Sequence, residues 1–538
     1  MRLSHLLTAT TFTFIFITTI SWGQDVSDEL KNWYNGPELG MNTDEAYATL
    51  LKGKSSTTVI VAVIDSGVDT EHEDLKGQIW VNEDEIAGNG IDDDHNGYID
   101  DVHGWNFLGN SEGENLHSVR LEVTRLYAEL RSKYASASAS DITPEQQEEW
   151  DLYQKVKEDV ESERSDAKEF KLEMKETYEG ITNIHNAVSG RLGEDYTVKD
   201  LKALKKDPQL GEPAKIMMKL MKLGLGYHDL KEYMDYNDEI LDYNYNPYID
   251  PRKDIIGDDV SDFTAGYGNN DYDGPDASHG THCAGIIGAV RGNGIGNNGI
   301  AADVKIMSLR AVPNGDEWDK DIALAVRYAV DNGAQVINMS FGKSYSPEQE
   351  QIIAAFRYAE ENGVLVVHAA GNEASDNDDS ENYPRPQYAS MSSKFSNWIE
   401  VGASTRHKKA KVKKGEIKRD GIAADFSNYG DQMVDVFAPG HDIYSTIPDN
   451  EYDLFDGTSM AGPMVSGVAA LIKSYYPELT MFEVREIILS SAQKTDREMP
   501  LPGDPEQMVT LSDLCVTGGI ANVYNAVQTA ENFSSSPK

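Results

Sequence analysis

The sequence contains little cysteine: its 538 residues include only two, Cys283 and Cys515. Two cysteines cannot build a disulfide framework of the kind that staples small secreted domains. They are either two buried free thiols or one bridge, and the sequence leaves both alternatives open. The length is sufficient for one large domain together with a substantial additional element.

Basic residues are also scarce, because 48 Lys and Arg stand against 91 Asp and Glu, which gives a formal net charge of −43. Nucleic acids and anionic membranes bind basic surfaces, so the charge excludes both classes of partner. An acidic surface of this kind suits solubility, divalent-cation binding or the attraction of basic partners. The simplest interpretation is a solvated acidic surface.

Long apolar runs are nearly absent, and the only one lies between Leu6 and Ile20, after the basic Arg2. This run is short for a membrane-spanning helix, and small and polar residues follow it. It therefore predicts a signal peptide over residues 1–23 and a protein that is secreted or periplasmic, without stable membrane insertion.

Short apolar, β-branched runs are present instead, at 59–64, 335–340, 363–367 and 399–403. Continuous apolar strands that alternate with helical patterns indicate a parallel sheet covered on both faces. The expected fold class is therefore α/β, with a doubly wound, mostly parallel sheet.

A different pattern separates the first of these strands from the others. Apolar residues recur at intervals of three and four over 116–134 and again over 150–178, which predicts amphipathic helices. Between them, Thr143 to Gln146 resembles a capping box with proline at the first helical position. We expect a signal peptide over 1–23, an α/β domain over 24–110 and 246–530, a helical insertion over 111–245 and a polar tail over 531–538.

Three short motifs carry groups suited to nucleophilic catalysis. Asp65 ends the first buried strand in VIDSGVD, His279 begins a helix in HGTHCAG, and Ser459 begins another in GTSMAGP. In open α/β sheets, functional groups gather where strands end and helices begin. The chain order Asp, His, Ser and the sequences of all three motifs resemble those of the subtilisin-like serine peptidases, the subtilases of peptidase family S8.

The resemblance extends over roughly 45–110 and 250–525 and implies a serine endopeptidase with the subtilisin-like fold. It assigns Ser459 as nucleophile, His279 as general base and Asp65 as the group that orients the imidazole. It also assigns the Asn372 side chain and the Ser459 backbone N–H to the oxyanion hole. No cofactor is needed for this chemistry.

Two histidines compete for the role of base, because His282 follows His279 by three residues. The motif assigns the base to His279, so we expect His282 to be a packed structural residue. Asn372 has a simpler alternative as a turn residue between Gly371 and Glu373. Cys283 is expected to be buried and inert beside the catalytic histidine.

Substrates implied by the resemblance are proteins and peptides. The segment 340–342 resembles the strand edge that pairs with an extended substrate, and 369–371 resembles one wall of the S1 pocket. The acidic run 373–379 either favours basic side chains at the cleavage site or forms a solvated loop. The residues assigned to substrate binding are Ser340, Phe341, Gly342, Ala369, Ala370 and Gly371.

Ligand-type residues over 92–103 follow the spacing of an EF-hand calcium loop, with Gly97 at position six. His103 stands at position twelve, where such loops carry glutamate, so a solvated acidic turn is the alternative. Calcium, if bound, would be structural. The candidate ligands are Asp92, Asp94, Asn96, Tyr98 through its carbonyl, and Asp100.

Two other functions compete with a general endopeptidase. One is a non-catalytic binding protein derived from a subtilase, but such a protein would be expected to lose the serine, the histidine or the asparagine. The other is a processing protease gated by the helical insertion, which would then contact inhibitors or protein partners. A stabilising strut is the simpler role for that insertion.

Overall fold

The structure is a computed structural model, which describes residues 26–223, 225–264, 266–406 and 422–534. The expected signal peptide over 1–23 lies outside the described residues. The chain divides into two units, one made of Met1–His117 and Ile255–Lys538 and the other of Ser118–Asp254.

The larger unit is built on a sheet that has nine strands within the described residues. Its order is β10-β13-β7-β6-β5-β4-β1-β3-β2, and neighbouring strands are parallel except for the antiparallel pair β10 and β13. The strands are β1 (Val59–Asp65), β2 (Gly104–Asn106), β3 (Val304–Arg310), β4 (Val336–Met339), β5 (Leu365–Ala369), β6 (Trp398–Ser404), β7 (Val436–Pro439), β10 (Gln493–Lys494) and β13 (Gly519–Ile520).

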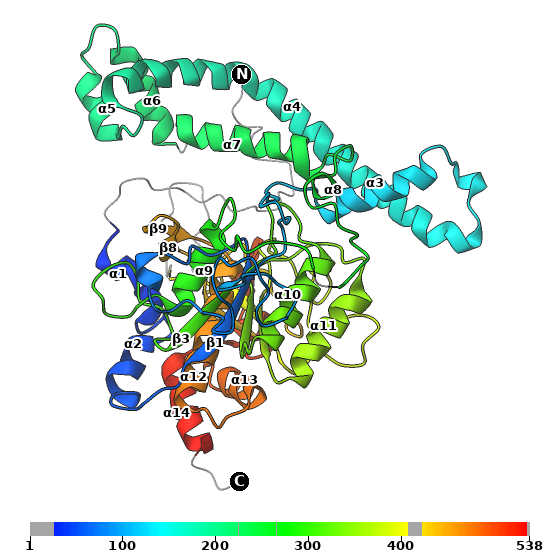
Figure 1. Cartoon of the computed structure of the whole chain (residues 1–538). Helices are drawn as coiled ribbons and strands as arrows, with labels where there is room; N and C mark the ends of the chain where they lie inside the picture. The colour runs from blue at the N-terminus through cyan, green and yellow to red at the C-terminus, as the bar shows by residue number, and fades with distance from the viewer. Residues whose placement is uncertain (1–25, 224, 265, 407–421, 535–538) are drawn as a thin grey trace. The chain divides into compact units, whose positions relative to one another are not determined.

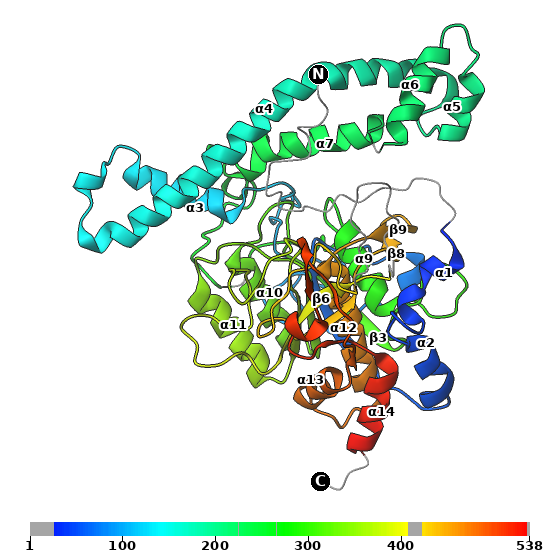
Figure 2. The ribbon, with the colours of Figure 1, turned by 180° about the vertical axis from the view of Figure 1, so that it is seen from behind.

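Alternating residues of β1 show why the sheet is covered on both faces. Val61 and Val63 join a core formed with helices α9, α12, α13 and α14, whereas Ala62 and Ile64 join a second core formed with α10 and α11. Figures 1 and 2 show these helices around the sheet. The predicted doubly wound α/β fold is therefore confirmed. The helices are α9 (Ser278–Gly288), α10 (Asp319–Asp331), α11 (Gln349–Glu361), α12 (Thr458–Tyr475), α13 (Met481–Ser490) and α14 (Val523–Ser534).

Shorter elements complete this unit. Two antiparallel hairpins, β8 with β9 and β11 with β12, lie outside the main sheet. The shorter elements are α1 (Asp28–Lys31), α2 (Thr43–Glu45), β8 (Ile443–Ile447), β9 (Glu451–Phe455), β11 (Met499–Leu501) and β12 (Asp504–Val509). Helix α8 (Pro251–Ile255) lies where the chain passes from the second unit back to this one.

The second unit is helical. The segment from Thr143 to Gln146 forms a capping box, and α4 of 46 residues follows it. Tyrosine rings join α3 to the first part of α4, and a small apolar core joins its last part to α5, α6 and α7. The helices are α3 (Glu122–Tyr134), α4 (Gln147–Leu192), α5 (Val198–Leu204), α6 (Gly211–Met221) and α7 (Tyr227–Glu239).

The helical unit spans 118–254, so both of its boundaries lie several residues later in the chain than the expected bounds of 111–245. Leu116 stays with the larger unit because its backbone N–H donates to Leu108 and its carbonyl accepts from the buried Arg310. At the other end, Asp250 belongs to the helical unit through a salt bridge of 3.1 Å with Arg120.

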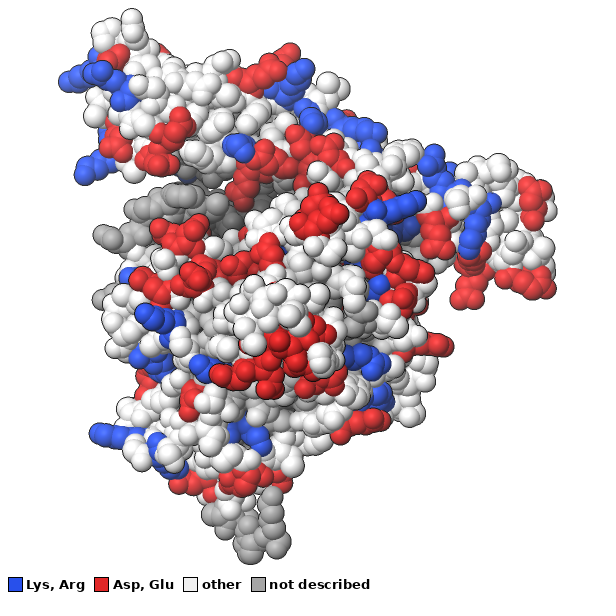
Figure 3. Space-filling view, in the orientation of Figure 1, with Lys and Arg blue, Asp and Glu red and all other residues white. Residues whose placement is uncertain are grey.

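The first four residues of the polar tail expected over 531–538 belong to helix α14. Helix α14 continues to Ser534, because Val527 and Ala530 are fully buried and hold its last turns against the core. Within the described residues, no helix combines the length and the apolar character needed to span a bilayer. Figure 3 shows acidic side chains in several patches on one face, in keeping with the net charge of −43.

Candidate active site

Asp65 and His279 meet where β1 ends and α9 begins. The Nδ1 atom of His279 lies 2.6 Å from Oδ1 of Asp65, whose side chain is only 1% exposed. This approach requires a glycine after the histidine. A Cβ on Gly280 would lie 2.0 Å from the carbonyl oxygen of Gly67 and 3.1 Å from the Cβ of Asp65.

Asp65 sets both the orientation and the basicity of the imidazole. Burial alone would lower the pKa of His279, but the negative charge of Asp65 and its hydrogen bond outweigh burial, so the pKa is raised. A carboxylate on Nδ1 also selects the tautomer in which Nε2 exchanges the proton. The pair therefore has the geometry of a general base with its orienting acid.

Ser459 is the second residue of α12 and is almost fully buried. Its hydroxyl donates to the carbonyl of Ser340 at 3.1 Å. Its own carbonyl accepts from the Ser340 hydroxyl at 2.9 Å and from the Cys283 thiol at 3.5 Å. These bonds join the start of α12 to the end of β4 and to α9, the helix that carries His279.

The amide of Asn372 is held by the residue that precedes the serine. Its Oδ1 accepts from the backbone N–H of Thr458 at 2.9 Å and from the Thr458 hydroxyl at 3.0 Å. That hydroxyl in turn accepts from the N–H of Gly371 at 3.1 Å. Because the oxygen is occupied, the NH2 group is the donor that Asn372 can offer to a ligand. Sequence reasoning missed the part played by Thr458, because its bonds reach a residue 86 positions earlier.

The two segments assigned to substrate binding follow the neighbouring strands β4 and β5. Ser340, Phe341 and Gly342 come directly after β4, and Ala369, Ala370 and Gly371 lie at the end of β5. The carbonyl of Ala370 accepts from three side-chain amides, of Asn377 at 2.8 Å, Asn382 at 2.9 Å and Asn428 at 3.0 Å.

Asn382 contacts both segments. Besides donating to Ala370, it places Oδ1 only 2.6 Å from where a Cβ of Gly342 would lie. Glycine is therefore required at 342, and Asn382 lies between the two strand ends. Sequence reasoning missed Asn382, because nothing in its local pattern connects it to residues that lie 12 and 40 positions earlier.

The model of the Subtilase family matches residues 56–504. The chain belongs to the Subtilase family. The resemblance read from the three motifs is thereby confirmed.

The chain is similar to several named subtilases. It is 40% identical over 229 residues to the thermophilic serine proteinase of Bacillus sp. (strain AK1), covering 42% of this chain and 50% of that protein. It is 39% identical over 198 residues to thermitase of Thermoactinomyces vulgaris, covering 36% and 61%. It is 35% identical over 217 residues to subtilisin DY of Bacillus licheniformis, covering 40% and 70%. The chain thus spans half of the length of the first of these relatives.

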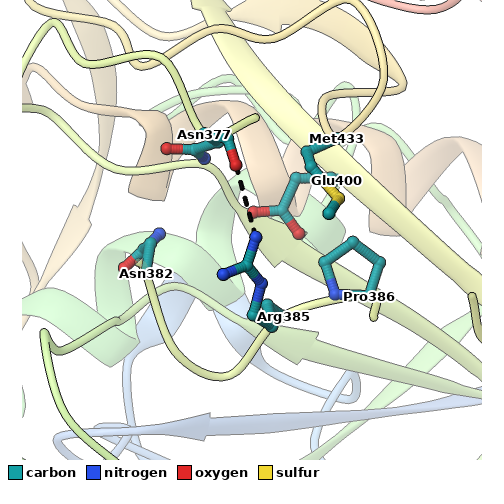
Figure 4. A pocket seen from close by; sticks show the side chains of 6 residues that line it. All are labelled: Asn377, Asn382, Arg385, Pro386, Glu400 and Met433. Atoms are coloured by element: carbon teal, nitrogen blue, oxygen red, sulfur yellow. Dashed lines mark hydrogen bonds between the residues drawn. The ribbon is translucent and has the colours of Figure 1, made fainter. Parts of the chain in front are cut away.

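A small cavity of this subtilase lies beyond Ala370, with a volume of about 10 Å³, close to the space of one water molecule. In Figure 4 the Arg385 side chain points toward Glu400 and Asn377, and its Nη2 donates to the Asn377 carbonyl at 3.4 Å. The lining residues are Asn377, Asn382, Arg385, Pro386, Glu400 and Met433.

The neighbours of His279 in this subtilase are structural. His282 is fully buried, its Nε2 donates to the carbonyls of Ile443 at 3.0 Å and Asp453 at 3.2 Å, and its ring stacks on Phe455. Burial lowers the pKa of His282 to about 3, so the ring stays neutral. Cys283 is a buried free thiol whose pKa is raised by burial, and Cys515, also buried, is free too.

The acidic loop gathers a set of carboxylates that differs from the one expected. Asp92 and Asp94 lie in a group with Glu85, in which one oxygen of each residue is within 4.8 Å of the others. The carboxylate of Asp100 instead accepts from the backbone N–H groups of Asn89 and Gly90, at 3.0 and 2.9 Å. Sequence reasoning missed Glu85, because it precedes the loop whose spacing suggested calcium.

The remaining two expected ligands have other contacts as well. The side-chain oxygen of Asn96 accepts from the Tyr98 N–H at 2.8 Å, and the Tyr98 ring packs against Trp105 and Tyr328. Hard oxygen donors such as the carboxylates of Glu85, Asp92 and Asp94 are those that Ca²⁺ prefers, so these three fit a calcium ion.

Proposed function

We propose that this subtilase is a serine endopeptidase that hydrolyses peptide bonds through an acyl-enzyme. The observation that carries the proposal is the hydrogen bond of 2.6 Å between Asp65 and His279, at the start of the helix whose Cys283 thiol donates to the Ser459 carbonyl. The names of the aligned relatives, which are proteinases and subtilisins, support the same class of reaction.

The reaction uses groups of the chain alone. The hydroxyl of Ser459 turns from the Ser340 carbonyl and attacks the scissile carbonyl carbon, while its proton moves to Nε2 of His279. The tetrahedral intermediate breaks its C–N bond as His279 returns the proton to the leaving amine. A water molecule, deprotonated by the same nitrogen, then attacks the ester and releases the carboxylic acid and Ser459.

Donors for the oxyanion are the NH2 group of Asn372 and the backbone N–H of Ser459. Charge that develops on the carbonyl oxygen is stabilised best by donors that are already oriented. The two hydrogen bonds from Thr458 hold the Asn372 amide in one orientation before substrate arrives.

Extended protein or peptide segments are the proposed substrates. The backbone of 340–342 pairs with the substrate, and 369–371 forms one wall of the pocket for the side chain at the cleavage site. Export of the enzyme is proposed from the pattern of residues 1–23. A structural calcium ion is proposed at Glu85, Asp92 and Asp94, supported by the grouping of their oxygens.

Labelling with a fluorophosphonate tests the proposal, because this reagent forms a covalent bond only with an activated serine. The purified protein should be labelled on Ser459, and Ser459→Ala should lose both the label and peptide hydrolysis. Ser466→Ala is the matched control, since Ser466 is a buried serine of the same helix. Absence of label, or a label elsewhere, would favour a non-catalytic binding protein with a subtilase fold.

A further inference from the structure

His368 and Glu400 form a buried pair that the catalytic chemistry does not use. They lie opposite each other on the neighbouring strands β5 and β6, and their side chains are 0% and 3% exposed. Nδ1 of His368 lies 2.9 Å from one carboxylate oxygen of Glu400 and 3.0 Å from the other. Nε2 lies 2.8 Å from the carbonyl oxygen of Phe341.

The two contacts of the ring determine where its protons lie. A carbonyl oxygen can only accept, so Nε2 of His368 carries a hydrogen. A neutral ring would then turn the lone pair of Nδ1 toward the carboxylate, which is repulsive. A second proton must therefore lie between Nδ1 and Glu400, and this bond holds the ring so that Nε2–H donates to the Phe341 carbonyl.

Other groups hold this pair in place. The indole N–H of Trp398 donates to Glu400 at 2.7 Å, and the backbone N–H of Glu400 donates to Asp435 at 2.9 Å. Arg485 forms a 3.4 Å salt bridge with Asp435, and Arg385 lines the same cavity as Glu400. Burying two ionisable groups is costly, so a pair placed beside the substrate segment calls for a function.

The contact with Phe341 indicates that function, because the segment 340–342 is held from three directions. The Ser340 carbonyl accepts from the Ser459 hydroxyl, and the Phe341 carbonyl accepts from His368. Lys343 exchanges two backbone hydrogen bonds with Tyr383, at 2.8 and 2.9 Å. His368 is the one side chain among these that bonds to the middle residue of the segment.

We propose that His368 and Glu400 are positioning residues for substrate binding, which fix the backbone of 340–342 through the Phe341 carbonyl. The inference rests on the proposed function, because it assigns substrate pairing to that segment. Without the pair, the Phe341 carbonyl loses its hydrogen-bond donor. The segment 340–342 can then rotate away from the extended form that a peptide substrate needs. The effect belongs to binding, because the bond that the pair makes to the backbone reaches the carbonyl of Phe341, within the segment assigned to substrate pairing.

The test compares His368→Ala with two further variants of the full-length protein. KM for an extended peptide amide should rise by about tenfold in His368→Ala, the scale of one lost hydrogen bond that leaves a buried carbonyl without its donor. The rate at which a short alkyl fluorophosphonate labels Ser459 should change by less than about twofold, because this reagent does not pair with 340–342. His368→Gln should recover part of the affinity, since its amide can donate to Phe341.

His72→Ala is the matched control. His72 is also fully buried in the larger unit and bonded to backbone, with Nε2 donating to the carbonyl of Glu451 at 3.2 Å. It should lower the melting temperature without raising KM. An unchanged KM in folded His368→Ala, or an equal loss of labelling and peptide cleavage in it, would overturn the inference. If His368→Ala does not fold, the same criteria apply to Glu400→Gln.

A binding measurement separates this inference from the proposed function. Anisotropy of a fluorescein-labelled decapeptide is measured with Ser459→Ala, alone and combined with His368→Ala or His72→Ala. Weaker binding only in the His368 combination supports the pair, even if the wild type takes no fluorophosphonate label and the proposed chemistry is wrong. Equal binding in all three proteins contradicts the pair, whatever the labelling result.

Discussion

The side-chain oxygen of Asn372 accepts two hydrogen bonds from one residue, the backbone N–H and the hydroxyl of Thr458, at 2.9 and 3.0 Å. Thr458 immediately precedes Ser459, so the proposed donor of the oxyanion hole and the proposed nucleophile are fixed to the same helix start. This arrangement removes the need to reorganise the amide during the reaction, which is the main source of electrostatic catalysis.

Replacing Asn372 should therefore lower turnover with little effect on substrate affinity. We expect Asn372→Leu to reduce kcat by about two to three orders of magnitude, the loss recorded for such a donor in a subtilisin. Thr458→Val keeps one of the two bonds and should lose roughly tenfold or less. Steady-state kinetics on a peptide amide measure both. A variant whose KM rises while kcat stays constant would place Asn372 in substrate binding instead.

The pH dependence of kcat/KM should report the contact between Asp65 and His279. Burial lowers the pKa of His279, but Asp65 raises it further, so the pKa lies above the ordinary histidine value of about 6.5. The base acts only when neutral, hence activity should fall as the pH drops through this raised value. An acid limb at or below about 6.5 would contradict the assignment.

Two variants control for this effect. Asp65→Asn removes the charge that raises the pKa of His279 and should move the acid limb downward, together with a large loss of turnover. Asp276→Asn removes a more exposed carboxylate that acts on His279 only through its charge, so its downward shift should be smaller. Equal shifts in the two variants would show that the hydrogen bond of Asp65 has no special part.

Much of the fold could be predicted because its signals are local. The apolar run at 59–64 and the three motifs each occupy only a few consecutive residues. In the structure the run forms β1, Asp65 ends that strand, and His279 and Ser459 lie in the first turns of two helices. The cap before α4 was predictable for the same reason, since Thr143 and Gln146 are three residues apart.

The remaining features depend on contacts between distant residues. Asn382 meets Ala370 and Gly342, Glu85 joins Asp92 and Asp94, and His368 pairs with Glu400 across two strands. Each partner alone is an ordinary polar residue. Its function follows only from strand order and register, which periodicity does not determine.

Calcium should raise the melting temperature of the protein, and a chelator should lower it. An ion that binds only the folded state stabilises it by an amount that grows with its concentration relative to Kd. Asp94→Asn should reduce the response if the ion lies among Glu85, Asp92 and Asp94. Asp84→Asn, an exposed change of the same type, should leave it intact. If the melting curves of the wild type coincide in calcium and in chelator, the proposed calcium site is wrong.

Acid should destabilise the larger unit through His282. Burial lowers the pKa of His282 to about 3 in the folded protein, whereas an unfolded histidine has a pKa of about 6.5. Between these two pH values the unfolded chain binds a proton that the folded protein does not. The contribution of His282 to the free energy of unfolding is therefore fully present above about pH 6.5 and is lost as the pH falls. One such proton changes the free energy of unfolding by about 1.4 kcal/mol per pH unit.

Denaturant unfolding of Ser459→Ala, chosen to prevent self-digestion, measures this loss between pH 7 and about pH 4.5. His282→Gln should be less stable at neutral pH, because the ring and its stacking on Phe455 are gone. The difference in free energy of unfolding between this variant and the protein that keeps His282 should shrink by about 2 kcal/mol as the pH falls to about 5. The reason is that only the protein with His282 gains a proton on unfolding in this pH range. The exposed His117→Gln should keep the full acid dependence, because His282 and its contacts are intact in this variant. Carboxylates titrate in all three proteins and cancel in the comparison, and the raised pKa of His279 acts only above about 6.5. A deficit of His282→Gln that is constant with pH would show that His282 does not carry the acid sensitivity.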